Sequence, residues 1–328
     1  MSTAPAHTAQ RWLFHRSVDI GWLLVPVWAC WALCFALPEA VLGAEVPLWL
    51  WVVVVLGIDV AHVWSTLFRT YLDPDEFSRH RQLLLLAPLV LFVLFLGVAS
   101  YSEPWFWRVM AYLALYHFMK QQYGFLALYR ARYGKRVAKR WFRDKWVMYA
   151  AMIYPVLYWH LTPGRAFSWF VEGDFFSWHW ETVALVFQWG HLAYALMLLG
   201  WLWEELRLTR QHGWPIAWGK VLWMLTTAGN WFLGIVYFNS DLAFTLTNVV
   251  AHGIPYVTLV AIYVSRKRQA AAPLLSRARP PWRLIAGMVA GILLLALAEE
   301  YLWDMLLNRE KHAFFAAWFD YPIAVVRN

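Results

Sequence analysis

Nine stretches of about 20 mostly apolar residues constrain this chain more than any other feature of its sequence. A helix of that length crosses the hydrocarbon core of a bilayer while bonding all of its backbone N–H and C=O groups internally. The predicted spans are residues 18–38, 47–68, 82–101, 105–129, 146–162, 181–203, 219–238, 242–264 and 284–303. The sequence therefore predicts an all-α, polytopic bundle of about nine transmembrane helices, with residues 1–328 forming a single transmembrane domain.

The composition supports this interpretation and excludes other classes of protein. Hydrophobic residues make up 62% of the chain and charged residues only 15%, whereas an average soluble domain carries about 25% charged residues. A soluble globule of this size has too little interior for so much apolar sequence. The high apolar content also excludes a disordered chain and a fibrous repeat.

The basic residues predict the orientation of the chain in the membrane. If the N-terminus is cytoplasmic, 22 of the 28 Lys and Arg residues lie on the cytoplasmic side, five lie outside, and Lys120 lies within a span. This asymmetry follows the positive-inside rule and favours a bacterial inner membrane protein. The net charge of +8 is then an orientation signal that also contacts anionic lipid headgroups, and no nucleic-acid partner is expected.

Four of the predicted spans carry a histidine away from their ends, together with other ionisable or amide side chains, and these polar residues need an explanation. An ionisable group in the bilayer costs roughly 2.5–3.5 kcal/mol on insertion scales. The residues concerned are Asp59, His62, His117, Lys120, Gln121, Gln188, His191, Asn248 and His252. Such groups are expected to face a protein interior or a wet cavity rather than lipid.

Helical spacing and depth relate these residues to one another. Asp59 and His62 are three residues apart and Asn248 and His252 are four apart, so each pair is predicted to share one face of its helix. The four histidines lie 10 to 15 residues from the outer ends of their spans. At ~1.5 Å per residue, their depths in the membrane agree within about 8 Å.

A set of imidazoles at one depth predicts a metal site, since imidazole is a common ligand for iron, zinc, copper and nickel. The expected ligands are His62, His117, His191 and His252. Gln188 and Asn248 would orient the rings of neighbouring histidines. Asp59 would orient or ligate, and Lys120 or Gln121 would position an oxygen-bearing intermediate. The predicted function is an intramembrane metalloenzyme, a non-haem iron oxidase or oxygenase for a lipid-like or isoprenoid substrate.

Several alternatives stay open at this point. Two of the histidines could bind haem b, with Arg69 pairing with a propionate. The polar residues could instead form the relay of a proton-coupled transporter, a purely structural polar core, or part of a non-catalytic subunit that binds other membrane proteins. The placement of single histidines on separate spans resembles that in membrane carotenoid-cleaving oxygenases and b-type cytochromes. No sequence motif of either group is present, so no family is assigned. The histidine boxes of membrane desaturases are absent.

A second polar segment follows the second span. Asp73 precedes Pro74, and Asp75 and Glu76 follow, which predicts a helix that begins with Asp73 as its N-cap. The alternatives are an inner-mouth gate, a headgroup site built on Arg69, Arg79 and Arg81, or a second metal site with Glu76 and His80.

Overall fold

The computed structural model describes residues 11–133, 141–165, 168–178, 183–213, 215–271, 282–308 and 311–317. Within these ranges every regular element is helical and no strand occurs. All nine predicted segments coincide with helical structure. The predicted all-α fold is therefore confirmed.

The helices of the first half of the chain begin and end as follows. They are α1 (Arg16–Val18), η1 (Asp19–Leu24), α2 (Val25–Ala36), α3 (Glu39–Leu42), α4 (Leu48–Leu50), η2 (Trp51–Val60), α5 (Ala61–Ser65), η3 (Thr66–Arg69), α6 (Pro74–Arg79), α7 (Arg81–Tyr101) and α8 (Glu103–Tyr133). Consecutive elements with no residue between them form one continuous helix, so residues 16–36 and 48–69 are each a single helix. The segments η1 and η2 are π-helical turns inside those rods, and η3 is a 3-10 turn.

The second half is built in the same way. Its helices are α9 (Trp141–Leu161), α10 (Val183–Gln211), α11 (Trp218–Trp231), η5 (Phe232–Tyr237), α12 (Asp241–Phe244), η6 (Thr245–Val249), α13 (Val250–Ala271), α14 (Trp282–Trp303), η8 (Asp304–Asn308) and α15 (His312–Ala316). The segments η5, η6 and η8 are π-helical. Single π-helical turns inside α-helices are rare and occur often at functional sites.

Within the described residues, five helices are long and apolar enough to cross a membrane, which indicates a membrane protein. They are Arg16–Ala36, Leu48–Arg69, Arg81–Tyr101, Asp241–Ala270 and Trp282–Leu306. Of these, α7 has no residue of its apolar window buried inside the protein. A helix with such a surface has hydrocarbon as its natural surroundings.

The chain divides into two compact units. The first comprises Met1–Val46 and Ala87–Pro255, and the second comprises Pro47–Leu86 and Tyr256–Asn328. One boundary lies within α13, directly after Pro255. Each unit is described by itself below.

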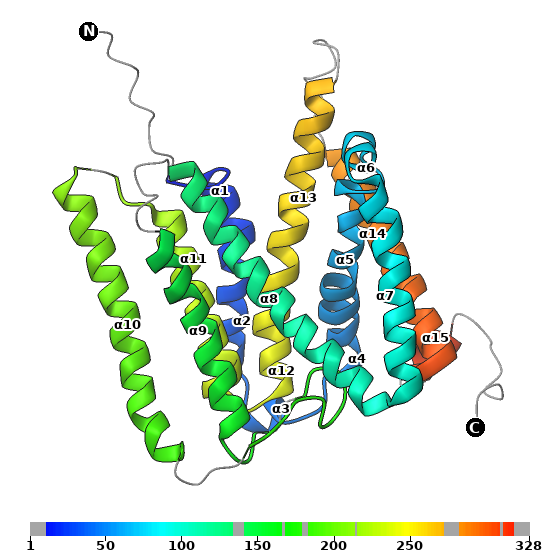
Figure 1. Ribbon diagram of the computed structural model, residues 1–328, viewed down its shortest axis with the longest axis horizontal. Helices are drawn as coiled ribbons and strands as arrows, with labels where there is room; N and C mark the ends of the chain where they lie inside the picture. Colours follow the sequence, from blue (N-terminus) through cyan, green and yellow to red (C-terminus); the bar gives the residue numbers. More distant parts are fainter. Residues whose placement is uncertain are drawn as a thin grey trace. The chain divides into compact units, whose positions relative to one another are not determined.

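The first unit is built around α11, which packs against α2, α8, α9 and η6. Figure 1 shows α8, α9 and α10 as neighbouring rods of this unit, and α9 contacts both of the others. Small residues allow close approach in the core. A Cβ added at Gly229 would lie 2.8 Å from the indole of Trp31, so only glycine fits at this crossing of α11 and α2.

The second unit is built on the packing of α14 against α5 and η2. Ala61, Ile292 and Ala296 form its buried core where these helices meet. A neighbouring cluster of Val260, Ala261 and Met288 joins α13 to α14. The alanines let the helices approach closely, as small residues do at helix contacts in membranes.

Candidate metal centre

Two of the four predicted histidines lie against each other in the first unit. His117 is on α8 and His252 is on α13, and the centroids of their rings are 4.9 Å apart with the ring planes at 76°. One ring nitrogen of each lies within 4.8 Å of one on the other. Two imidazoles bound to one ion at ~2.1 Å, with an angle of about 100° between them, have centroids about 5 Å apart. The centroid separation of the pair is therefore compatible with two ligands of one metal ion.

The two rings differ in their surroundings. His252 is fully buried, and its ring stacks on Phe118 with centroids 3.7 Å apart and planes 7° apart. His117 is exposed. The arrangement combines one sheltered, fixed imidazole with one that a hydrophobic molecule in the membrane can approach.

Two glutamines of α8 bond to α13, and Pro255 explains one of these bonds. Proline has no N–H, so the carbonyl of Ala251, four residues earlier, receives no helical hydrogen bond. Gln122 Nε2 donates to this carbonyl at 3.2 Å, and Gln121 Nε2 donates to the carbonyl of His252 at 2.6 Å. Neighbouring helices satisfy freed backbone groups in this way within membranes. The two amides fix the backbone of His252 relative to the helix that carries His117.

Gln122 is itself held by α11. Its side-chain Oε1 accepts from the hydroxyl of Thr227 at 3.0 Å, and its backbone carbonyl accepts from Trp223 Nε1 at 3.0 Å. Both bonds are buried. Gln121 is predicted to position an oxygen-bearing intermediate, and in the structure its amide N–H group donates to the backbone carbonyl of His252. Together the two glutamines join α8, α11 and α13 around the histidine pair.

Asn248 also has a partner that its spacing did not predict. Its Oδ1 accepts from Asn230 Nδ2 at 3.0 Å, and its Nδ2 donates to Thr247 Oγ1 at 3.1 Å. The four-residue spacing to His252 implies a shared face only in an α-helix, and residues 245–249 are π-helical, with bonds between residues five apart. The orientation of the His252 ring by Asn248 stays a prediction.

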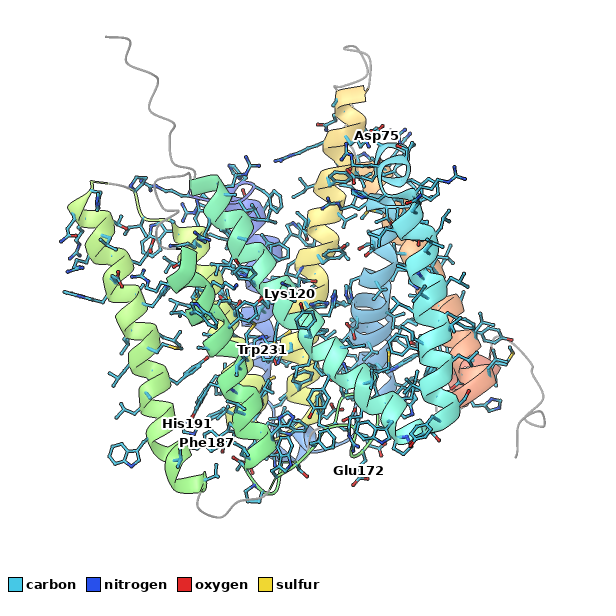
Figure 2. All side chains as sticks on the ribbon, in the orientation of Figure 1. Asp75, Lys120, Glu172, Phe187, His191 and Trp231 are labelled. Atoms are coloured by element: carbon cyan, nitrogen blue, oxygen red, sulfur yellow. The ribbon has the colours of Figure 1, made fainter. Side chains whose placement is uncertain are left out.

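His191 belongs to a separate aromatic group on α10. The hydroxyl of Tyr154 lies 2.6 Å from its Nδ1, and its ring packs against Tyr158 and Phe232. Figure 2 shows His191 on α10 close to Phe187. In the part of the chain that the structure describes, His191 does not join His117 and His252 in one cluster of potential ligands. The side chain of Gln188 lies outside the described residues.

Asp59 and His62 form a pair in the second unit. Oδ1 of Asp59 lies 3.6 Å from Nδ1 of His62, so the two side chains share a face as their spacing predicts. His62 is buried, and Tyr256 packs edge-on against its ring with centroids 6.1 Å apart. Asp59 also lies close enough to Glu300 for electrostatic interaction. A carboxylate beside an imidazole is a usual way to fix the tautomer of the ring.

Lys120 and Arg69 lie over aromatic rings. Lys120, labelled about halfway along α8 in Figure 2, is exposed, and its Nζ lies 5.9 Å from the centroid of Tyr116 and 6.0 Å from that of Tyr123. The guanidinium of Arg69 lies 4.6 Å from the centroid of Tyr263 in the second unit. Both are cation–π contacts.

The predicted N-cap at Asp73 is confirmed and has a further role. Asp73 accepts from the N–H groups of Asp75 and Glu76 at the start of α6. It also accepts from Tyr263 Oη at 2.5 Å and forms an ion pair with Lys267, both on α13. The bond from Lys267, and next the bond from Tyr263, hold the pKa of Asp73 well below its usual value. This carboxylate joins α6 to α13 within the second unit.

A buried ion network in the first unit was not predicted. Lys220 Nζ lies 2.8 Å from a carboxylate oxygen of Glu205 and 3.3 Å from one of Asp144, and all three side chains are buried. Arg130 Nε lies 3.3 Å from Asp144, and Trp201 Nε1 donates to it at 2.9 Å. One signal was available in the sequence. These charges lie at the ends of different predicted spans, on the side predicted to be cytoplasmic, where opposite charges can pair.

Comparison with known proteins gives no information on function, so the function is argued from this geometry. No family model matches the chain, and neither the curated proteins nor the solved structures contain a match. Chemically, the site in the first unit offers two imidazole nitrogen donors on helices joined by hydrogen bonds from glutamine side chains. Such a site can bind a transition metal.

Proposed function

We propose that this chain is an intramembrane metalloenzyme in which His117 and His252 bind one metal ion. The observation that carries the proposal is the 4.9 Å separation of the two rings, on helices held together by Gln121 and Gln122. Rigid support of this kind is what a metal site needs, since loosely held ligands lose affinity. Packing alone does not require two adjacent imidazoles inside a membrane protein.

The proposed ion is iron and the proposed reaction is oxidation or oxygenation of a lipid-like or isoprenoid substrate. Imidazole suits iron, and iron with open coordination positions supplies redox chemistry with dioxygen. In this proposal His252 holds the ion from the buried side. His117 holds it from the exposed side, where a substrate dissolved in the membrane arrives. The remaining ligands are to be sought among the other predicted histidines, His62 and His191.

Haem b is a weaker alternative for this pair. Axial histidines on opposite faces of a haem have ring centroids on the order of 6 Å apart, because the iron lies between the two nitrogens on a straight line. The observed 4.9 Å is too short for that arrangement. A Soret band in the purified protein would reverse this preference.

Elemental analysis of the purified chain tests the proposal. After expression in metal-replete medium, we expect about one iron per chain. His117→Ala and His252→Ala should each lose it, whereas His212→Ala, at the exposed end of α10, should keep it. His62→Ala and His191→Ala then identify the other ligands. Substoichiometric metal in the wild type, or unchanged loading in His117→Ala, would contradict the proposal and favour a polar relay or a non-catalytic subunit.

The proposed topology has nine spans with a cytoplasmic N-terminus in a bacterial inner membrane. It rests on the distribution of Lys and Arg, 22 of 28 on one side, and on helices at all nine predicted segments. Reporter fusions after residues 40, 102, 165 and 240 should all report the outer side. A reversal at any of these positions would change the span count.

A further inference from the structure

A second candidate site lies in the second unit, where a cavity of about 450 Å³ opens along α14. This volume is within the range of small-molecule sites, about 300–1,000 Å³. Its lining residues are Trp64, Leu295, Ala298, Glu299, Leu302, Trp303 and Leu306. We call it the Glu299 groove, and it takes no part in the proposed metal chemistry.

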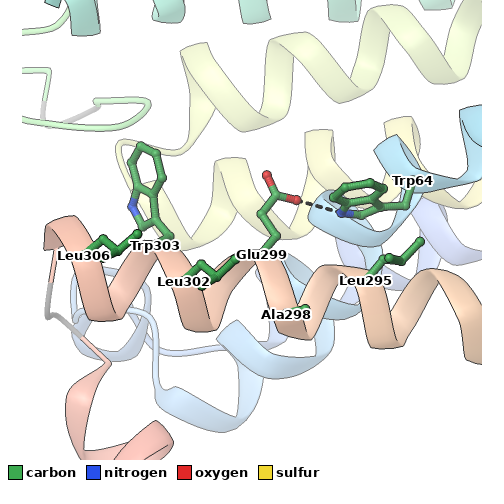
Figure 3. A pocket seen from close by; sticks show the side chains of 7 residues that line it. All are labelled: Trp64, Leu295, Ala298, Glu299, Leu302, Trp303 and Leu306. Atoms are coloured by element: carbon green, nitrogen blue, oxygen red, sulfur yellow. Dashed lines mark hydrogen bonds between the residues drawn. The ribbon is translucent and has the colours of Figure 1, made fainter. Parts of the chain in front are cut away.

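Glu299 is the one ionisable residue among those that line the groove. Its Oε2 accepts a hydrogen bond from Trp64 Nε1 at 2.7 Å, and Figure 3 shows the carboxyl between the indoles of Trp64 and Trp303. A single N–H donor compensates only part of the cost of placing a carboxylate in an apolar groove. No Lys or Arg lines the groove to supply the opposite charge.

The depth of the groove gives a second constraint. Glu299 lies seven residues before Leu306, where the apolar helix Trp282–Leu306 ends. At ~1.5 Å per residue the carboxyl is about 10 Å from that end. Trp303 lies one turn nearer the end, as expected for a tryptophan near the membrane interface. The groove therefore extends from the interface into the hydrocarbon.

Each wall of the groove favours one part of a particular kind of ligand. A carboxylate attracts a cation, so Glu299 favours an ammonium group. The leucines and the alanine offer an apolar surface for an alkyl chain. We propose that the Glu299 groove binds an amphiphilic primary amine from the membrane, with its ammonium group at Glu299 between the two indoles and its alkyl chain along α14.

Equilibrium binding of dodecylamine tests this assignment. The full-length protein is placed in phosphatidylcholine nanodiscs, and the dodecylamine retained by empty nanodiscs is subtracted. We expect saturable binding near neutral pH and none of dodecanol, which has the same chain without the charge. Glu299→Gln keeps an oxygen acceptor for Trp64 and should weaken binding about tenfold or more. Glu300→Gln, which removes a neighbouring charge outside the groove, should bind like the wild type.

A groove-filling variant separates site binding from general attraction to the protein. Ala298→Phe places a ring in the groove and should abolish saturable binding while Glu299 is still present. Equal binding of dodecanol, or unchanged dodecylamine affinity in both Glu299→Gln and Ala298→Phe, would overturn the proposal. The iron content of these variants should match the wild type, so failure here is distinct from failure of the proposed metal centre.

Discussion

The side-chain amide of Gln122 donates to the carbonyl of Ala251, the carbonyl that Pro255 deprives of its helical partner. A glutamine on one helix thus compensates for a proline on another. Water is scarce in the hydrocarbon, so an unbonded carbonyl there costs several kcal/mol. The contact is therefore expected to be energetically significant.

A double-mutant cycle measures this compensation. Gln122→Ala should lower the free energy of unfolding by roughly 1–3 kcal/mol, because it leaves a buried carbonyl unpaired. In a Pro255→Ala background, residue 255 regains an N–H, and the loss caused by Gln122→Ala should shrink by about 1 kcal/mol. Thermal or denaturant unfolding in detergent gives both values. Additive losses would show that Gln122 acts through Thr227 alone.

Metal removal should destabilise the wild type and leave the histidine variants unaffected. A ligand that binds only the folded state adds RT ln(1 + [L]/Kd) to its stability. Dialysis against a chelator should therefore lower the melting temperature of the wild type, and added iron should restore it. In His117→Ala the temperature should respond to neither treatment. A shift of equal size in that variant would place the metal elsewhere.

Asp73 predicts an acid-dependent loss of stability. Its folded-state pKa lies below that of the unfolded chain, about 3.9, so the unfolded state binds the proton more readily. The stabilisation is complete above about pH 5 and is lost progressively as the pH falls toward the folded-state pKa. Asp73→Asn should flatten the dependence of melting temperature on pH in this acid range. Asp75→Asn, an exposed partner of the same lysine, is the control and should keep the dependence.

Lys220 should be among the most sensitive positions of the first unit. Lys220→Met leaves Asp144 and Glu205 buried without the cation that lies between them, and breaking such a pair costs roughly 3–5 kcal/mol. Adding Glu205→Gln to Lys220→Met should recover part of the loss, since it removes one of the two charges that Lys220 contacts. Arg207→Met, at an exposed position on α10, should change the melting temperature little. A loss no larger than that of Arg207→Met would show that the carboxylates are satisfied without Lys220.

The sequence allowed accurate prediction where a local rule decides the structure. Length and apolarity located the helices, and the order Asp73, Pro74, Asp75, Glu76 located the start of α6. Both features depend on neighbouring residues and on the solvent, so they can be recognised without the tertiary fold.

Other features depend on contacts between distant segments and could not be recognised in this way. Asn248 lies in the π-helical turn η6 and bonds to Asn230 of α11, a contact that residue spacing does not reveal. The bond from Gln122 depends on a proline more than 130 residues later in the chain. The span positions predict similar depths for the four histidines. Only the packing of the helices shows that His117 contacts His252, whereas His191 contacts Tyr154.

The order in which the chain is synthesised gives the glutamine pair a further consequence. Gln121 precedes the carbonyl to which it bonds by 131 residues, so α8 leaves the ribosome well before α13. When α13 enters the bilayer with its proline, a donor for its freed carbonyl at Ala251 is already present on α8. A shift of α13 along α8 would separate that carbonyl from the Gln122 amide. The helix that is synthesised first thus carries the hydrogen-bond donor for the peptide group that proline leaves unpaired in the later helix.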